Sequence, residues 1–250
     1  MLPRNRSLLL VALAVTTLPG CVSWSPSVWV EDSRTFRLPA DSVERVEVET
    51  HNGGIHAEAP SSGGEEVVVV ASIRAGGETE EDASACLDAI AIDFGIEDGV
   101  VTTKARYSVS KKSTWGMKVS YQVTMPASAG LNVVTHNGGI DVQGIEGGLD
   151  LETHNGPVTV NGAKATWRVR THNGRIEVAG APESLELVSH NGGVVAAIAG
   201  TGPLEGKVET HNGSIRIDLL EPRDVAMTGV TNNGRIKVSD DFTTEVSERR

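Results

Sequence analysis

A four-residue motif, Thr-His-Asn-Gly, recurs along this chain at nearly constant spacing, and the spacing limits the folds that the chain can adopt. Five copies match in full; one variant has Ser for Thr, and another has Asn for His. The copies are Thr50–Gly53, Thr135–Gly138, Thr153–Gly156, Thr171–Gly174, Ser189–Gly192, Thr210–Gly213 and Thr231–Gly234. From Thr135 to Ser189 the interval is constant, and the intervals to Thr210 and Thr231 are slightly longer and equal to each other. A fixed period of this size predicts a stack of one repeated structural unit.

Apolar residues flank each copy with a spacing of two, which is the period of a strand with one buried face. Around the third copy, Leu149 and Leu151 come before the motif, and Val158 and Val160 come after it. Each repeat is therefore expected to form a strand, a turn, a second strand and a return loop. Because a single short coil cannot bury its apolar face, the coils must stack. The sequence predicts an all-β protein, a parallel β-solenoid with coils of 18–21 residues.

The motif itself is predicted to form the turn between the two strands. Asn tolerates the left-handed region of backbone conformation and Gly adopts it freely. The alternation of the preceding strand places Thr153 and Asn155 inward and His154 outward, and stacked Asn side chains can bond amide to amide along the axis. The predicted turn ladder comprises Asn137, Gly138, Asn155, Gly156, Asn173, Gly174, Asn191, Gly192, Asn212, Gly213, Asn233 and Gly234. The two longer intervals are expected to place extra residues in return loops.

The long interval between the first two copies predicts a small α+β insert at residues 57–130, followed by regular repeats at 131–250. Its pattern indicates strands at Val67–Ile73, Ile92–Ile96 and Val100–Tyr107, and a helix at Thr79–Ala91 with Cys86 on its buried face. Terminal units of repeat stacks usually protect exposed edge strands. We expect the insert to cap one end of the solenoid.

Residues 1–20 predict a bacterial lipoprotein signal peptide. Arg4 and Arg6 precede an apolar run, and the segment ending in Gly20 and Cys21 resembles a lipobox, in which the cysteine receives lipid. Residues 21–41 would be the lipidated N-terminus and a tether, and residues 42–250 the folded domain. We expect an exported, lipid-anchored envelope protein, and Val22 favours the outer membrane where the bacterium has two membranes. An ordinary secretion signal is the alternative.

The net charge of the chain is −11, and removal of the leader with its two arginines takes it to −13. Nucleic acids and anionic lipid surfaces require basic patches on their partners, so the charge argues against both. The expected partners are the membrane, through the lipid anchor, and an unidentified envelope or surface partner.

The repeats of the form Asn-Gly-x-[Ile/Val]-x-Val, the single early copy and the insert that ends at residues 121–126 carry a family resemblance. Together they resemble the bacterial putative-adhesin family of β-strand repeat domains, which is related to head-GIN domains, over residues 42–238. The resemblance implies a β-solenoid, an envelope location and no established enzymatic chemistry. It supplies no catalytic residues, and it does not explain the near-uniform histidine of the motif.

Six of the seven histidines occupy the second position of the motif. The outward ladder would include at least His136, His154, His172, His190 and His211. Adjacent imidazoles are suitable ligands for Zn²⁺, Cu²⁺ or Ni²⁺, and these are the candidate cofactors of the chain. We expect instead a packed imidazole ladder that stabilises the turns and holds no cofactor, and a metal site is the alternative. Since like charges oppose simultaneous protonation, such a ladder should lose stability as the pH falls through about 6.

Motifs of familiar catalytic classes, such as G-x-S-x-G, the P-loop, C-x-x-C and H-E-x-x-H, do not occur in the sequence. Trp115, in a loop beside Lys111 and Lys112, is expected either to pack on its own domain or to stack on a sugar. We expect a non-catalytic envelope scaffold for adhesion or surface interaction, with no catalytic residues. The alternatives are a metal- or pH-responsive envelope protein that uses the histidines and, third, a polysaccharide-acting β-helix enzyme.

Overall fold

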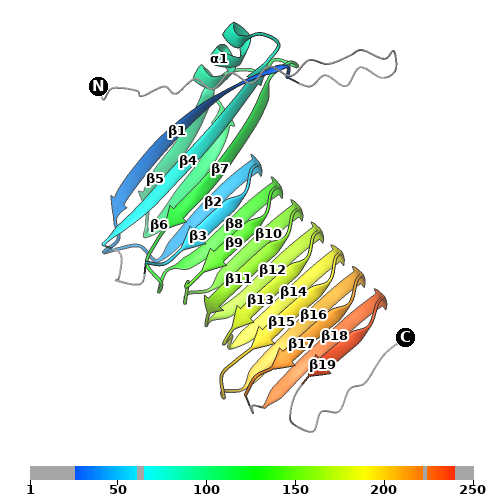
Figure 1. Ribbon diagram of the computed structural model, residues 1–250. Helices are drawn as coiled ribbons and strands as arrows, with labels where there is room; N and C mark the ends of the chain where they lie inside the picture. Colours follow the sequence, from blue (N-terminus) through cyan, green and yellow to red (C-terminus); the bar gives the residue numbers. More distant parts are fainter. Residues whose placement is uncertain (1–25, 61–64, 222–223, 240–250) are drawn as a thin grey trace.

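The protein is a flattened parallel β-solenoid of two facing sheets (Figure 1), seen in a computed structural model that describes residues 26–60, 65–221 and 224–239. Sheet A has ten strands in the spatial order β1 (Val28–Pro39), β4 (Glu66–Gly77), β7 (Gly116–Thr124), β3 (Ile55–Glu58), β9 (Ile140–Gln143), β11 (Val158–Ala163), β13 (Ile176–Gly180), β15 (Val194–Ile198), β17 (Ile215–Leu219) and β19 (Ile236–Ser239). Sheet B has nine, in the order β18 (Val225–Asn233), β16 (Leu204–Asn212), β14 (Ser184–Asn191), β12 (Thr166–Asn173), β10 (Leu149–Asn155), β8 (Gly130–Asn137), β2 (Arg45–Asn52), β6 (Val100–Tyr107) and β5 (Ile90–Glu97).

Each coil contributes one strand to each sheet, in the register that the motif spacing predicts. Leu149 pairs with Leu131 on one side and with Trp167 on the other, so each partner lies one repeat away in the sequence. Leu204 pairs with Val225, which is again one repeat away although this repeat is longer. The extra residues lie in the loops before β16 and β18, as expected. The predicted all-β parallel solenoid is confirmed.

The core is a narrow layer of aliphatic side chains between the two sheets. Leu151, Val158, Val160 and Val169 are each completely buried, and along each strand they alternate with residues that are more exposed. Burial of one such side chain contributes roughly 1.5–3 kcal/mol. Trp167 takes the place of a leucine in its column and is also completely buried. The period-two pattern of the sequence therefore identifies the core correctly.

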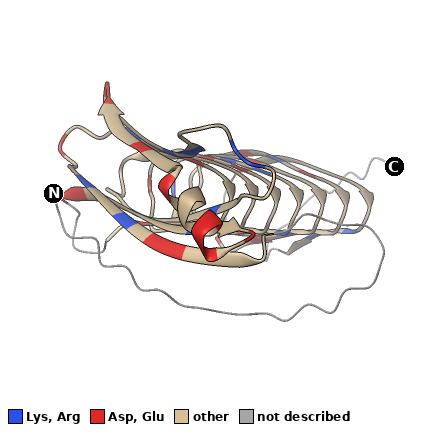
Figure 2. Cartoon of the chain, turned by 90° about the horizontal axis from the view of Figure 1, so that it is seen from above, with Lys and Arg blue, Asp and Glu red and all other residues tan. Residues whose placement is uncertain are grey.

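The insert extends both sheets beyond the first coil. Strand β7 pairs with β3 in sheet A, β6 pairs with β2 in sheet B, and β4 and β5 add antiparallel partners. The helix α1 (Glu80–Asp88) follows the N-cap Thr79, whose side chain accepts a hydrogen bond from the Asp82 amide. At the end of the stack Phe36 of β1 and Phe94 of β5 bring the two sheets together, with ring centroids 4.9 Å apart. Figure 2 shows this end of the molecule, where α1 and the outer strands lie. The expected cap is confirmed, but the helix predicted at Thr79–Ala91 ends at Asp88, and β5 begins at Ile90.

The predicted tether at residues 21–41 is wrong for Val28–Pro39, which form the edge strand β1 and pair with β4 along their whole length. The apolar and polar residues of this strand do not alternate in the sequence, because Asp32 and Arg34 occupy inward positions between Val30 and Phe36. Arg34 Nε donates to Asp32 Oδ2 at 3.2 Å, and its Nη1 donates to the Ile90 carbonyl at 2.8 Å. An ion pair thus occupies two inner-face positions that are usually apolar in a strand with one buried face.

The predicted signal peptide (residues 1–20) and the lipidated Cys21 lie outside the described residues. Within the described ranges no helix has the length and apolar character needed to cross a bilayer.

Candidate functional site: the histidine column

The threonine of the motif ties each turn to the turn of the preceding coil. Thr153 Oγ1 donates to the Gly138 carbonyl at 2.8 Å, and Thr171 Oγ1 donates to the Gly156 carbonyl at 3.0 Å. Both side chains are almost completely buried. Their inward orientation agrees with the prediction. Each hydroxyl satisfies a carbonyl that the turn leaves without a strand partner, which is the requirement for buried polar groups.

The glycine of the motif is required by close approach between coils rather than by left-handed backbone. None of the six glycines of the predicted ladder has a positive φ. A Cβ atom on Gly174 would lie 1.9 Å from the Gly156 carbonyl oxygen, and a Cβ atom on Gly156 would lie 2.0 Å from that of Gly138. The predicted reason for glycine was therefore wrong, although its place in the turn was correct.

The asparagines form the predicted amide ladder. Asn155 Nδ2 donates to Asn137 Oδ1 at 2.7 Å, Asn173 Nδ2 donates to Asn155 Oδ1 at 2.8 Å, and the pattern continues to Asn233. The side chains are largely exposed, so the inward orientation predicted for Asn155 is wrong. The chain leaves the regular strand alternation at this corner, and two consecutive residues, His154 and Asn155, both face solvent.

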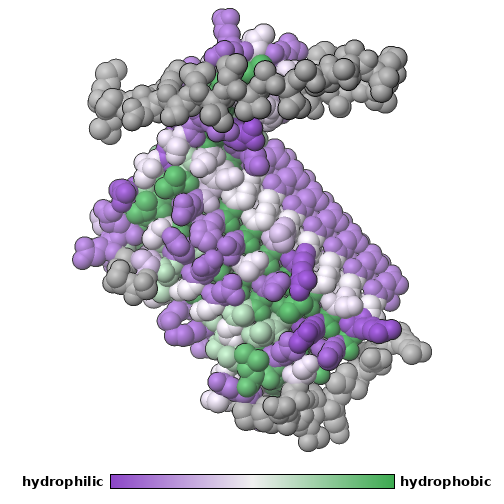
Figure 3. All heavy atoms as spheres, viewed as in Figure 1, coloured by the Kyte–Doolittle hydropathy of each residue, from purple (hydrophilic) through white to green (hydrophobic). Residues whose placement is uncertain are grey.

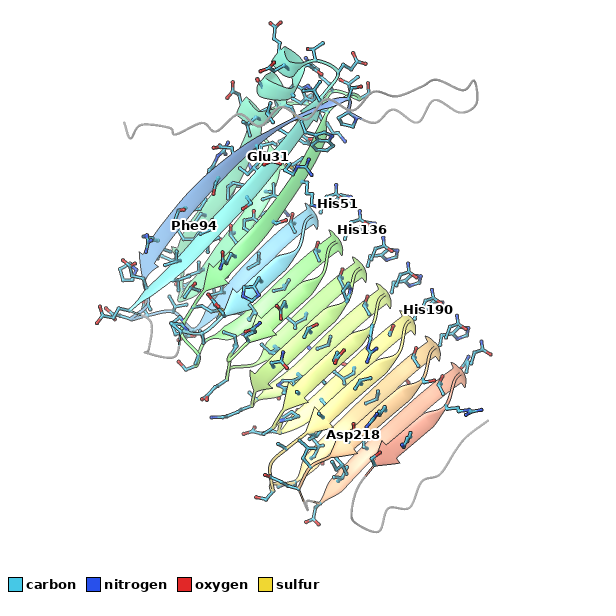
Figure 4. The ribbon with its side chains drawn as sticks, in the orientation of Figure 1. Glu31, His51, Phe94, His136, His190 and Asp218 are labelled. Atoms are coloured by element: carbon cyan, nitrogen blue, oxygen red, sulfur yellow. The ribbon has the colours of Figure 1, made fainter. Side chains whose placement is uncertain are left out.

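The histidines form an exposed column along the same edge of the solenoid, and three of them are labelled in Figure 4. Neighbouring rings are nearly parallel, with interplanar angles of 2–6° and centroid distances of 4.6–4.9 Å. The column comprises His51, His136, His154, His172, His190 and His211. It ends at Asn232, whose Nδ2 lies 2.9 Å from His211 Nδ1. The fixed spacing of the coils gives every ring the same orientation.

A shallow groove of about 560 Å³ runs beside the column and crosses six strands of sheet B. Its wall opposite the imidazoles is formed by the residue two positions before each histidine, and Val134 there is 43% exposed. These wall residues are Glu49, Val134, Glu152, Arg170 and Val188. Figure 3 shows the continuous hydrophilic row that the motif turns form along one edge of the stack. The groove therefore has apolar and charged portions beside a continuous row of imidazoles.

The stacked arrangement is unsuited to metal chelation as it stands. Zinc binds a histidine nitrogen at about 2.0–2.1 Å, in the plane of the ring. Parallel rings 4.6–4.9 Å apart direct their nitrogens side by side rather than towards a common point. No group of three His, Cys, Asp or Glu side chains in the described part of the chain is placed to hold a metal ion. Binding at His136, His154, His172, His190 or His211 would require a ring to rotate out of the stack.

Trp115 is only 6% exposed and packs within the cap, as the first of its two interpretations predicts. Its Nε1 donates to Asp82 Oδ1 at 2.9 Å, and Lys112 Nζ donates to the same oxygen at 2.8 Å. The hydrogen bond from Lys112, followed by that from Trp115, holds the pKa of Asp82 well below its usual range. Cys86 is completely buried, and burial raises the pKa of its thiol. These residues stabilise the cap.

Sequence reasoning missed an interaction of the seventh histidine. His56 Nδ1 lies 3.0 Å from Asp141 Oδ2, and its Nε2 lies 3.6 Å from Glu58 Oε2, on the outer face of sheet A. The two partners His56 and Asp141 are 85 residues apart, so only the pairing of β3 with β9 brings them together.

A search of family models finds no match to this chain, and a search of curated proteins finds none either. Solved structures do match. A putative adhesin from Bacteroides fragilis is 17% identical, with 86% of this chain and 99% of that chain covered and a TM-score of 0.45. A putative adhesin from Parabacteroides merdae is 14% identical (83% and 96% covered, TM-score 0.34), and a putative cell adhesion protein from Clostridium sporogenes is 6% identical (83% and 98% covered, TM-score 0.31). These structures are described in the same terms as the family that the sequence resembles.

Proposed function

We propose that this protein is a non-catalytic scaffold of the cell envelope that binds a surface partner along the groove beside the histidine column. The observation that carries the proposal is the continuity of this groove, whose lining comes from β6, β2, β8, β10, β12 and β14. Repeat proteins commonly bind partners on extended surfaces of this kind, which cross many units. The predicted leader and the predicted lipidation of Cys21 support the envelope location.

The proposal is tested by coupling the purified protein to beads and counting the bacterial cells that the beads retain. The groove variant carries Val134→Glu and Val188→Glu, which place charged side chains along the wall. The matched control is Leu220→Glu, because Leu220 is 61% exposed and is not among the groove residues. We expect the wild type and the control to retain cells and the groove variant to lose retention. Equal retention by all three proteins would place the binding surface elsewhere, and retention by none would contradict the adhesion role.

A second candidate function is metal-responsive binding, in which one or more of the six exposed imidazoles rotate out of the stack to hold an ion. Its ions are Zn²⁺, Cu²⁺ or Ni²⁺, which imidazole suits as a ligand. A chelator-competition titration of the wild type and of a His154→Ala, His172→Ala double variant tests it. Submicromolar binding that the double variant loses would support a metal site, and weak binding equal in both proteins would refute it.

A further inference from the structure

We infer that the histidine column is a pH-gated binding site for a linear acidic polysaccharide, one that carries carboxylates along its length. The inference rests on the proposed function, because it assigns a ligand class to the same groove. Three features of the described residues support this inference: the free imidazole nitrogens, the nearly balanced charge of the groove wall and the apolar side chains within that wall.

The ring nitrogens of the column are available to a ligand. Within the described part of the chain, His51, His136, His154, His172 and His190 make ring contacts with one another but have no hydrogen bond to protein atoms. Each ring carries two nitrogens, and a protonated ring can donate from both. Because the rings are parallel and evenly spaced, they offer a regular row of donors to one polymer chain lying along the axis.

Most charged side chains beside the column form ion pairs, so the protonation of the histidines determines the sign of the electrostatic potential in the groove. Glu49 Oε2 lies 2.7 Å from Lys104 Nζ, and Arg170 Nη2 lies 2.9 Å from Glu186 Oε2. Glu209, two residues before His211, is 2.9 Å from Lys207, and Arg175, three residues after His172, is 3.3 Å from Glu177. Other charged residues near the column are Glu152, Arg235 and Lys118, and Lys118 follows Met117, whose carbonyl accepts a hydrogen bond from Asn52 Nδ2. When the imidazoles are neutral, the positive and negative side chains beside the column nearly cancel, whereas protonation of the rings adds positive charge.

The overall negative charge of the protein does not prevent this binding. Charges separated by more than a Debye length, about 8 Å at physiological salt, are largely screened from one another. Protonated neighbours 4.6–4.9 Å apart repel each other strongly at this distance, and a row of carboxylates relieves that repulsion. Ligand binding and proton uptake are therefore linked, and each promotes the other.

The apolar side chains in the groove wall favour a sugar polymer over other polyanions. Val134 and Val188 lie in the groove wall between charged residues, and Ala105 lies at one end of the groove. Sugar rings have C–H faces that can contact these side chains while their carboxylates meet the imidazoles. Polyphosphate has no apolar face, and nucleic acid recognition generally requires a strongly basic surface.

The test measures binding of polygalacturonate to the purified protein by calorimetry at pH 5.5 and pH 7.5, with fully methyl-esterified polymer and monomeric galacturonate as controls. We expect binding to be at least about tenfold tighter at pH 5.5, to weaken with added salt and to require both the free carboxylates and the polymer. Repetition in two buffers with different ionisation enthalpies should show net proton uptake.

The residue test uses a His154→Asn, His172→Asn double variant, because Asn232 occupies the same motif position in the last coil. The matched control is His56→Asn, since His56 lies on sheet A beside Asp141. Binding at pH 5.5 should fall in the double variant and stay unchanged in the control, with both proteins folded by circular dichroism. Equal affinity at the two pH values, equal binding of the methyl ester or of polyphosphate, or no loss in the double variant would overturn the inference. If the cell-retention test succeeds while this one fails, the scaffold function stands and only the ligand class is wrong.

Discussion

Replacement of the motif glycine in a central coil should severely destabilise the solenoid. A Cβ atom on Gly174 would lie 1.9 Å from the Gly156 oxygen, whereas ordinary contacts begin at 3.4 Å, so the two turns must move apart until that gap is restored. That displacement breaks the bond from Thr171 to Gly156 (3.0 Å), the bond from Asn173 to Asn155 (2.8 Å) and the nearby bond from the Val158 amide to the Arg175 carbonyl (2.9 Å). At about 1 kcal/mol for each bond, Gly174→Ala should lower the free energy of unfolding by about 3 kcal/mol or more.

Urea unfolding followed by far-ultraviolet circular dichroism measures this loss. The control is Gly95→Ala in β5, because a Cβ atom there meets nothing within 4 Å. Alanine in a strand is no worse than glycine, so the control should change the stability by less than about 1 kcal/mol. If Gly174→Ala were as stable as the control, the close approach between coils would not be the reason for glycine in the motif.

Three further changes probe the other ladders and the cap. Asn173→Asp removes a donor to Asn155 and places a carboxylate beside the amide ladder, so the free energy of unfolding should fall by about 1–3 kcal/mol in the same urea assay; no change would show that the ladder bonds are energetically neutral. A shift from pH 8 to pH 5 adds like charges to the stacked histidines, so the melting temperature should fall, and it should fall less in the His154→Asn, His172→Asn variant; a flat profile would contradict repulsion within the column. Because the pKa of Asp82 is lowered in the folded protein, the stability that its carboxylate contributes is complete above the ordinary aspartate pKa and is lost only as the pH falls through the lowered value. Asp82→Asn should therefore loosen the loop that holds Trp115 at neutral pH and increase the quenching of Trp115 fluorescence by iodide. Unchanged quenching would contradict the anchoring role of Asp82.

The sequence predicts the solenoid well because every level of its pattern agrees. The period-two apolar pairs, the constant motif spacing and the inward threonine all require the same stack, and Leu149, Leu151 and Thr153 lie where they were expected. Such agreement between local pattern and global fold is the condition under which sequence reasoning succeeds. The insert was predictable for the same reason, since Thr79 caps its helix, and Asp98 and Gly99, both with positive φ, form its hairpin turn.

The features that sequence reasoning missed depend on distances between coils or on pairs far apart in the chain. The strand β1 was missed because Asp32 and Arg34 point inward and neutralise each other there. The close approach at Gly174 follows from the coil spacing, which no local pattern states. The contact between His56 and Asp141 requires the register of two strands from different repeats. These features are tertiary in origin, and a single repeat read alone contains no signal for them.

The histidine column differs from the neighbouring column of residues two positions earlier in the chain, and this difference bears on the role of the histidines. Both columns lie on the same strands, so any process that multiplied the coil multiplied both. The column two residues earlier now reads Glu49, Val134, Glu152, Arg170, Val188, Glu209 and Val230, whereas histidine is retained in six of seven copies. Stacking alone explains this retention only if the rings stabilise the fold, and Asn232 shows that the turn forms without one. Substitution of His154 and His172 by Asn therefore separates the two reasons: a loss of stability assigns the column to the turn, and a loss of binding with stability retained assigns it to a ligand.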